Sequence, residues 1–184
     1  MSTSTELKKL LQTYLSEYQA ICEQSRTEKM GKMNPGEPVP IAGTIYGNDF
    51  AARFDDVCGK LRAEAEKLLQ AEKDRVKLAI TEAPDPAAVN TIMLLNTRSA
   101  VTEAEIMTLL EKYGGNYQTR EALRDIANKH SIWLPEEDDV LMRIGRLEKA
   151  ILDALTRSNA DTGHATPGYF SLLRLQIDDL FGAE

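Results

Sequence analysis

Residues 101–150 constrain the fold of this chain most, because they hold three short helices with clear start and stop signals. Thr102 and Glu105 have the spacing of a capping box, in which a hydroxyl and a carboxylate each satisfy an unpaired backbone N–H at a helix start. Val101 and Ile106 stand at the positions of a hydrophobic staple. Gly114 and the glycine after it can leave the helical region without a Cβ penalty. The pattern predicts a helix over 103–113.

Two more helices follow in the same stretch. One is predicted over 118–129, with Leu123, Ile126 and Ala127 facing inward. The next is predicted to begin at Pro135, whose missing N–H costs nothing in the first turn of a helix. Its apolar face is formed by Val140, Leu141, Ile144, Leu147, Ile151, Leu152 and Leu155.

Two long helices are predicted upstream. The first starts at Thr3, keeps an apolar face for four turns or more, and is expected to fray between Glu23 and Lys32. The second runs from Asp49 toward Ile80, a length of about 45 Å at 1.5 Å per residue. Its apolar stripe thins past Leu69, so its end is expected to project or to meet a partner chain.

Residues 33–48 between these helices form a Pro/Gly-rich segment. Asn34-Pro35-Gly36 is a turn signal, and the alternate prolines Pro38 and Pro40 favour extended backbone. The connection is long for a helical domain, where two to eight residues are usual. Two interpretations stay open, an extended arm that docks on a neighbouring molecule and a loop packed across its own helices.

The remaining signals complete an all-α plan. Asp85 and Pro86 are a good N-cap and first residue for another helix, residues 156–166 have the composition of an exposed loop, and Pro167 opens a terminal helix. The apolar face of that helix either completes the core or docks elsewhere. We expect six or seven helices, arranged as a long antiparallel hairpin over 1–82, with the arm at 33–48, and a compact helical bundle over 83–184.

Composition and charge narrow the classes of function. The 42% hydrophobic and 28% charged residues are ordinary for a globular protein, and no run reaches the ~18 apolar residues that span a bilayer. With no hydrophobic signal core at the N-terminus, we expect a cytoplasmic protein without a membrane partner. The net charge of −7 repels phosphate backbones, which makes nucleic acid an unlikely partner.

No reactive constellation is evident in the sequence. Cys22, Cys58, His130 and His164 have no metal-ligand spacing, so a zinc site or a Cys–His pair would require them to meet in the fold. His130 is more simply placed at the end of its helix, and both cysteines are expected to be buried thiols. Phosphate-binding, dinucleotide-binding and nucleophile-elbow motifs are absent from the sequence. The prediction is a non-enzymatic protein with no catalytic residue, metal, cofactor or small-molecule substrate.

The acidic run Glu136, Glu137, Asp138 and Asp139 precedes an apolar helical pattern and is accounted for by the helix dipole. Residues 123–132, followed by a helix from Pro135, resemble a helix-turn-helix, with Ser131 where that motif usually has Gly. The second helix would bring four carboxylates to the phosphates at the groove edge. A DNA-binding regulator is therefore the least favoured alternative.

Segments 40–47 (Pro-Ile-Ala-Gly-Thr-Ile-Tyr-Gly) and 113–117 (Tyr-Gly-Gly-Asn-Tyr), among otherwise ordinary helices, resemble helical proteins encoded in bacteriophage and prophage structural gene modules. This resemblance implies a non-enzymatic accessory protein of the capsid or tail, made in the host cytoplasm, where it either remains or is incorporated into a virion. It carries over no catalytic or binding residue.

Self-association or a protein partner is the hypothesis that the residues favour, through the arm and the helix toward Ile80. The competing hypothesis is an acidic inhibitor or nucleic-acid mimic, whose carboxylates at 136–139, together with Asp153, Asp178 and Asp179, fill a basic groove on a host protein. The candidate partner-binding residues are Pro38, Pro40, Ile41, Ile45, Tyr46, Val76, Ile80, Glu136, Glu137, Asp138 and Asp139.

Overall fold

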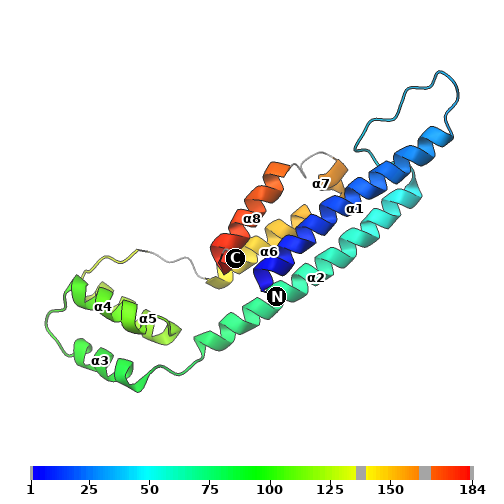
Figure 1. Cartoon of the computed structure of the whole chain (residues 1–184). Helices are drawn as coiled ribbons and strands as arrows, with labels where there is room; N and C mark the ends of the chain where they lie inside the picture. Colours follow the sequence, from blue (N-terminus) through cyan, green and yellow to red (C-terminus); the bar gives the residue numbers. More distant parts are fainter. Residues whose placement is uncertain (1, 136–139, 162–166, 183–184) are drawn as a thin grey trace. The chain divides into compact units, whose positions relative to one another are not determined.

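A computed structural model describes residues 2–135, 140–161 and 167–182. All regular secondary structure in these ranges is helical, which confirms the all-α prediction, and eight helices are present rather than six or seven (Figure 1). They are α1 (Thr3–Gly31), α2 (Asn48–Ile80), α3 (Pro86–Asn96), α4 (Glu103–Tyr113), α5 (Tyr117–Lys129), α6 (Val140–Ala154), α7 (Arg157–Asp161) and α8 (Pro167–Phe181).

The chain divides into two compact units. The first consists of Met1–Glu72 together with Leu141–Glu184, and the second is Lys73–Val140. Helix α2 contributes to both, since it passes from Glu72 into Lys73 without a break. This grouping differs from the expected segments 1–82 and 83–184, because α6 and α8 pack with the N-terminal helices rather than with α3, α4 and α5.

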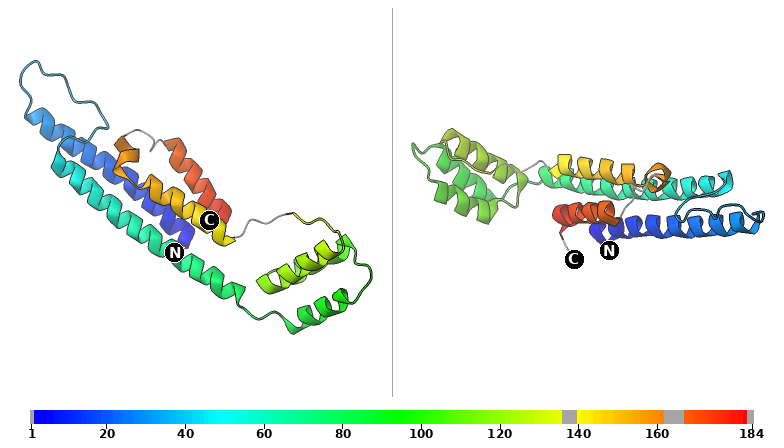
Figure 2. Two further views of the ribbon diagram at one scale, coloured as in Figure 1. Left: turned by 180° about the vertical axis from the view of Figure 1, so that it is seen from behind. Right: turned by 90° about the horizontal axis from the view of Figure 1, so that it is seen from above.

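In the first unit, α1 and the first part of α2 lie antiparallel and side by side (Figures 1 and 2). The ring centroid of Tyr14 on α1 lies 5.4 Å from that of Phe54 on α2 and 5.4 Å from that of Phe170 on α8. These three aromatic side chains are almost completely buried. Burying a side chain of this size stabilises the fold by about 1.5–3 kcal/mol, so the apolar face of α8 completes this core.

Polar contacts fix the other helices of the first unit. Lys8 forms an ion pair with Asp178 of α8, and Arg143 of α6 pairs with Asp179 of α8 at 2.6 Å.

The prediction of a loop over residues 156–166 is wrong in its first part, because residues 157–161 form helix α7. The side chain of Thr156 caps the start of this helix, since its Oγ1 accepts a hydrogen bond of 3.4 Å from the Asn159 amide.

The second unit packs α3, α4 and α5 around a small core. The predicted capping box of α4 is confirmed, since the Thr102 hydroxyl accepts from the Glu105 amide and the Glu105 carboxylate accepts from the Thr102 amide. Val101 and Ile106 are buried in one cluster, as a hydrophobic staple requires. The buried residues of the core are Leu95, Val101, Ile106, Leu123, Ile126 and Ala127.

Helix α5 ends in a Schellman motif. His130 is the C-cap, as expected, and Ser131 adopts the left-handed conformation with φ 56°. The Ile132 amide then donates to the Ala127 carbonyl at 2.8 Å. The prediction that a helix begins at Pro135 is wrong at that residue, which is not helical. Residues 136–139 lie outside the described residues, and α6 is Val140–Ala154.

Among the helices that the structure describes, none combines the length and the apolar character needed to cross a bilayer.

Candidate interaction surfaces

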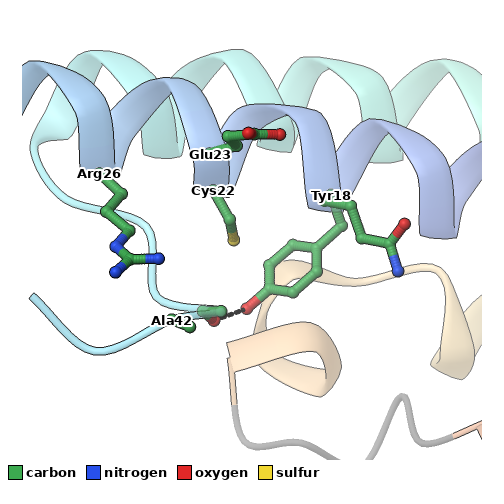
Figure 3. A pocket seen from close by; sticks show the side chains of 7 residues that line it. Tyr18, Cys22, Glu23, Arg26 and Ala42 are labelled. Atoms are coloured by element: carbon green, nitrogen blue, oxygen red, sulfur yellow. Dashed lines mark hydrogen bonds between the residues drawn. The ribbon is translucent and has the colours of Figure 1, made fainter.

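The arm that connects α1 to α2 is fastened to α1 along its returning half. The Tyr18 phenol donates a hydrogen bond of 2.6 Å to the Gly43 carbonyl (Figure 3). The Ser25 hydroxyl donates to the Tyr46 carbonyl at 2.8 Å and accepts from the Tyr46 amide. Ser25 is buried, and α1 continues to Gly31, which lies within the interval from Glu23 to Lys32 where its end was expected.

A pocket of about 230 Å³ lies between α1 and the arm (Figure 3). The side chain of Cys22 points from α1 into this space, toward Ala42 of the arm, with Arg26 and Tyr18 on either side. Cys22 and Cys58 are both free and buried. Among the described residues that line this pocket, none is a histidine.

The other cysteine is held in its neutral form. Burial raises the pKa of the Cys58 thiol to about 11, and the nearby carboxylate of Asp55 acts in the same direction. The thiolate is the reactive form of cysteine, so this side chain is a packing residue at neutral pH. Within the part of the chain that the structure describes, no three His, Cys, Asp or Glu side chains are arranged to hold a metal ion.

The tip of the arm is exposed and apolar. Val39 is 62% exposed and Ile41 is 77% exposed, and Pro38 is also exposed. Of the other candidate residues, Pro40, Ile45 and Tyr46 are half-buried. Isolated exposed apolar residues are normal on a protein surface. Val39 and Ile41 differ from most of them because they lie on a segment that hydrogen bonds attach to α1.

The candidate residues Val76 and Ile80 lie on the last turns of α2 and belong to the second unit. Both are half-buried, whereas Leu78 between them is exposed and was not predicted. The Ile80 carbonyl accepts a hydrogen bond of 3.3 Å from the Gln118 side chain, which ties this end of α2 to the start of α5. These residues and the arm are therefore parts of different units.

The acidic candidates Glu136, Glu137, Asp138 and Asp139 lie outside the described residues, as does His164. The acidic-inhibitor hypothesis stays a prediction.

The helix-turn-helix interpretation needs α5 to pair with the helix that follows it in the sequence. From Leu141 onward, α6 belongs to the first unit, whereas α5 belongs to the second.

Sequence reasoning missed a groove of about 310 Å³ in the second unit. It is lined by Met107, Leu110, Glu111, Gly114, Arg120, Arg124, Leu134 and Pro135. Trp133, the only tryptophan of the chain, adjoins this lining in the sequence and is 78% exposed. One sequence pattern could have indicated this surface. Tyr117, Arg120 and Arg124 recur at helical spacing, so they share the side of α5 that is opposite the buried Ile126.

The start of α4 carries the strongest electrostatic perturbation in this unit. The backbone N–H of Thr102, followed by the guanidinium of Arg98, lowers the pKa of Glu105 to about 2. The Arg98–Glu105 ion pair measures 2.7 Å. Because the carboxylate caps a helix, its low pKa is explained by structure and indicates no acid–base role.

Comparisons of the chain with protein-family models, with curated proteins and with solved structures find no match.

Proposed function

We propose that this chain is a non-enzymatic assembly protein that self-associates through the tip of the arm. One observation carries the proposal. Tyr18 and Ser25 hold the returning half of the arm on α1, while Val39 and Ile41 remain exposed. A segment that only connected two helices would not need exposed apolar side chains at a position fixed by hydrogen bonds.

The energetics favour such a surface. An arm that is ordered before binding loses less conformational entropy on association than a free loop, and Pro38 and Pro40 restrict its backbone further. Full burial of Val39 or Ile41 contributes about 1.5–3 kcal/mol. In a two-fold symmetric dimer each contact occurs twice, so a small patch gains from the symmetry.

The larger role that we propose is that of an accessory protein of a bacteriophage or prophage capsid or tail, made in the host cytoplasm. Its support is the resemblance of segments 40–47 and 113–117 to proteins of structural gene modules. In this proposal α1 and α2 form a long antiparallel hairpin that carries the arm at one end. The helix end around Val76 and Ile80 is a second contact region for a neighbouring subunit.

The experiment is light scattering coupled to size exclusion, over a wide range of protein and salt concentrations. The wild-type chain should form a defined oligomer that resists salt, because apolar contacts are not screened. The double variant Val39→Ser with Ile41→Ser should be monomeric with unchanged helical circular dichroism. Tyr18 and Ser25 stay intact in this variant, so the arm keeps its attachment.

The matched control is Leu175→Ser on α8, which makes the same kind of change at a side chain that is 65% exposed. It should leave the oligomer intact. A wild-type chain that is monomeric at every concentration refutes self-association, and an oligomer that survives in the double variant refutes the role of the arm.

A further inference from the structure

The outer part of the arm, which lies between α1 and α2 in Figure 1, is a short extended segment. Residues 35–36 and 42–43 form turns, and residues 37–41 between them make neither a turn nor a bend. The prolines at 38 and 40 prevent a helix there and restrict each preceding residue to extended backbone. The arm therefore presents extended backbone that Tyr18 and Ser25 attach to α1.

The two edges of this segment differ in their hydrogen-bonding groups. In extended backbone, residues 37, 39 and 41 direct their N–H and C=O groups to one edge, and residues 38 and 40 direct theirs to the other. Pro38 and Pro40 have no N–H to donate, so the second edge cannot form a complete ladder. Only the first edge is suited to pairing with another strand.

Four backbone groups on the first edge make no hydrogen bond within the part of the chain that the structure describes. They are the amides of Val39 and Ile41 and the carbonyls of Glu37 and Val39. The other two groups on this edge are occupied. The Glu37 amide donates to the Asn34 carbonyl at 3.2 Å, and the Ile41 carbonyl accepts from the Tyr46 phenol at 3.1 Å.

The four free groups are complementary to the same groups of a second copy. Residues that face each other at a hydrogen-bonded position of an antiparallel pair exchange two bonds, and the next such positions lie two residues away. With Val39 opposite its counterpart, the two valines exchange two bonds, and the Ile41 amide of each copy meets the Glu37 carbonyl of the other. This register uses all four free groups. The two groups that it leaves over, the Glu37 amide and the Ile41 carbonyl, are the ones already satisfied within the chain.

The charge of the segment also favours a second copy as its partner. Residues 38–48 contain no charged side chain, in a chain whose net charge is −7. Two arms can therefore approach along this segment without bringing side chains of like charge together. In the same register the Val39 side chains of the two copies lie side by side, and cross-strand pairs of β-branched residues stabilise a ladder.

We propose that two copies of this chain pair their arms as an antiparallel two-stranded ladder centred on Val39. This inference rests on the proposed self-association and specifies how the arms bind. A two-stranded ladder is marginally stable alone, so it acts together with the burial of the Val39 and Ile41 side chains. The contact has a two-fold axis and closes at two copies, which protects the exposed edge from further pairing.

The first test is amide hydrogen exchange of the full chain, measured residue by residue below and above the concentration at which it associates. The amides of Val39 and Ile41 should exchange at least about tenfold more slowly in the associated form, because each gains an acceptor. The Ala42 amide is the internal control. It has no hydrogen bond among the described residues and lies outside the ladder, so its exchange should not change.

The second test removes a donor without removing the apolar character of the arm. Val39→Pro deletes one ladder N–H from each copy, and the dissociation constant measured by light scattering should rise at least about tenfold, since each dimer loses two hydrogen bonds. Ala42→Pro is the matched control. Gly43, with φ 81°, suits the third position of a type II turn, where proline is common at the position before it. This variant should leave the dissociation constant unchanged.

The outcomes separate this inference from the proposal on which it rests. A wild-type chain that is monomeric at every concentration refutes both. An oligomer that Val39→Ser with Ile41→Ser disperses, but in which the two amides exchange as fast as in the monomer, refutes the ladder alone. The same conclusion follows if Val39→Pro associates as tightly as the wild type.

Discussion

The phenol of Tyr14 donates a hydrogen bond of 2.6 Å to the backbone carbonyl of Thr156, 142 residues further along the chain. Tyr14 is fully buried on α1, and Thr156 joins α6 to α7. This bond connects the beginning of the first unit to the helices that complete it. The same carbonyl also accepts a backbone hydrogen bond of 3.4 Å from the Ala160 amide, so the phenol is its second donor.

Replacing Tyr14 with Phe should lower the free energy of unfolding by about 0.5–1.5 kcal/mol. The ring and its stacking on Phe170 are kept, but the Thr156 carbonyl is left without its phenol donor. Thermal denaturation followed by circular dichroism measures the change. Tyr18→Phe is the matched control, since its bond to Gly43 is exposed to solvent and its loss should cost less. Equal losses in the two variants would contradict the role of the buried bond.

The end of α4 requires glycine at one position and tolerates a side chain at the next. A Cβ on Gly114 would clash with the Leu110 carbonyl oxygen and lie 3.2 Å from its carbon, whereas nothing stands within 4 Å of a Cβ on Gly115. Gly114→Ala should destabilise the second unit by about 1–3 kcal/mol. Gly115→Ala should be neutral or slightly stabilising. Denaturant titration followed by Trp133 fluorescence distinguishes the two, and a neutral Gly114→Ala would show that the turn relaxes freely.

Ser131 is the one non-glycine residue with positive φ among those described. An L side chain in the left-handed region costs roughly 1–2 kcal/mol, and glycine removes this cost. Part of the gain is lost again, because glycine also gives the unfolded chain more conformational freedom. Ser131→Gly should therefore stabilise the second unit by about 0.5–1 kcal/mol. Ser99→Gly, at a position without positive φ, should give no gain. The same Trp133 titration measures both variants.

Stability of the second unit should depend on pH through Glu105. Its pKa falls from 4.5 to about 2 on folding, so the unfolded chain binds the proton more readily. The contribution to stability is complete above the unfolded pKa and is lost as the pH falls from 4.5 toward 2. Thermal melts of the wild type and Glu105→Gln across this range should converge at the acid end. Parallel curves would mean that other groups govern acid unfolding.

Local signals predicted the starts of α3 and α4 well. Thr102, Glu105 and Asp85 occupy their expected cap positions, because a capping bond spans two or three residues and is visible in the sequence. The contact that holds the last turns of α1 could not be predicted, for the opposite reason. Ser25 is held by Tyr46, 21 residues away, and no local pattern encodes that contact.

The grouping of helices was harder to infer from the sequence. The apolar faces of α6 and α8 were visible as periodic patterns, but periodicity does not say which partner a face will cover. The groove was missed because Met107, Arg124 and Leu134 come from three segments that meet only in the folded unit. The exposure of Trp133 likewise depends on how the segment after α5 turns.

The discontinuous first unit imposes an order on biosynthesis. A ribosome delivers the whole of the second unit, Lys73–Val140, before it has made Phe170 of α8. A domain can fold as a unit once all of its residues have emerged from the ribosome. The second unit can therefore complete its fold before the first unit, although the first unit contains the N-terminal helices. Until α8 arrives, the nascent chain carries α1 and α2 with the ring of Tyr14 lacking its stacking partner. In that interval the core face around Tyr14 is still without the helix that completes it.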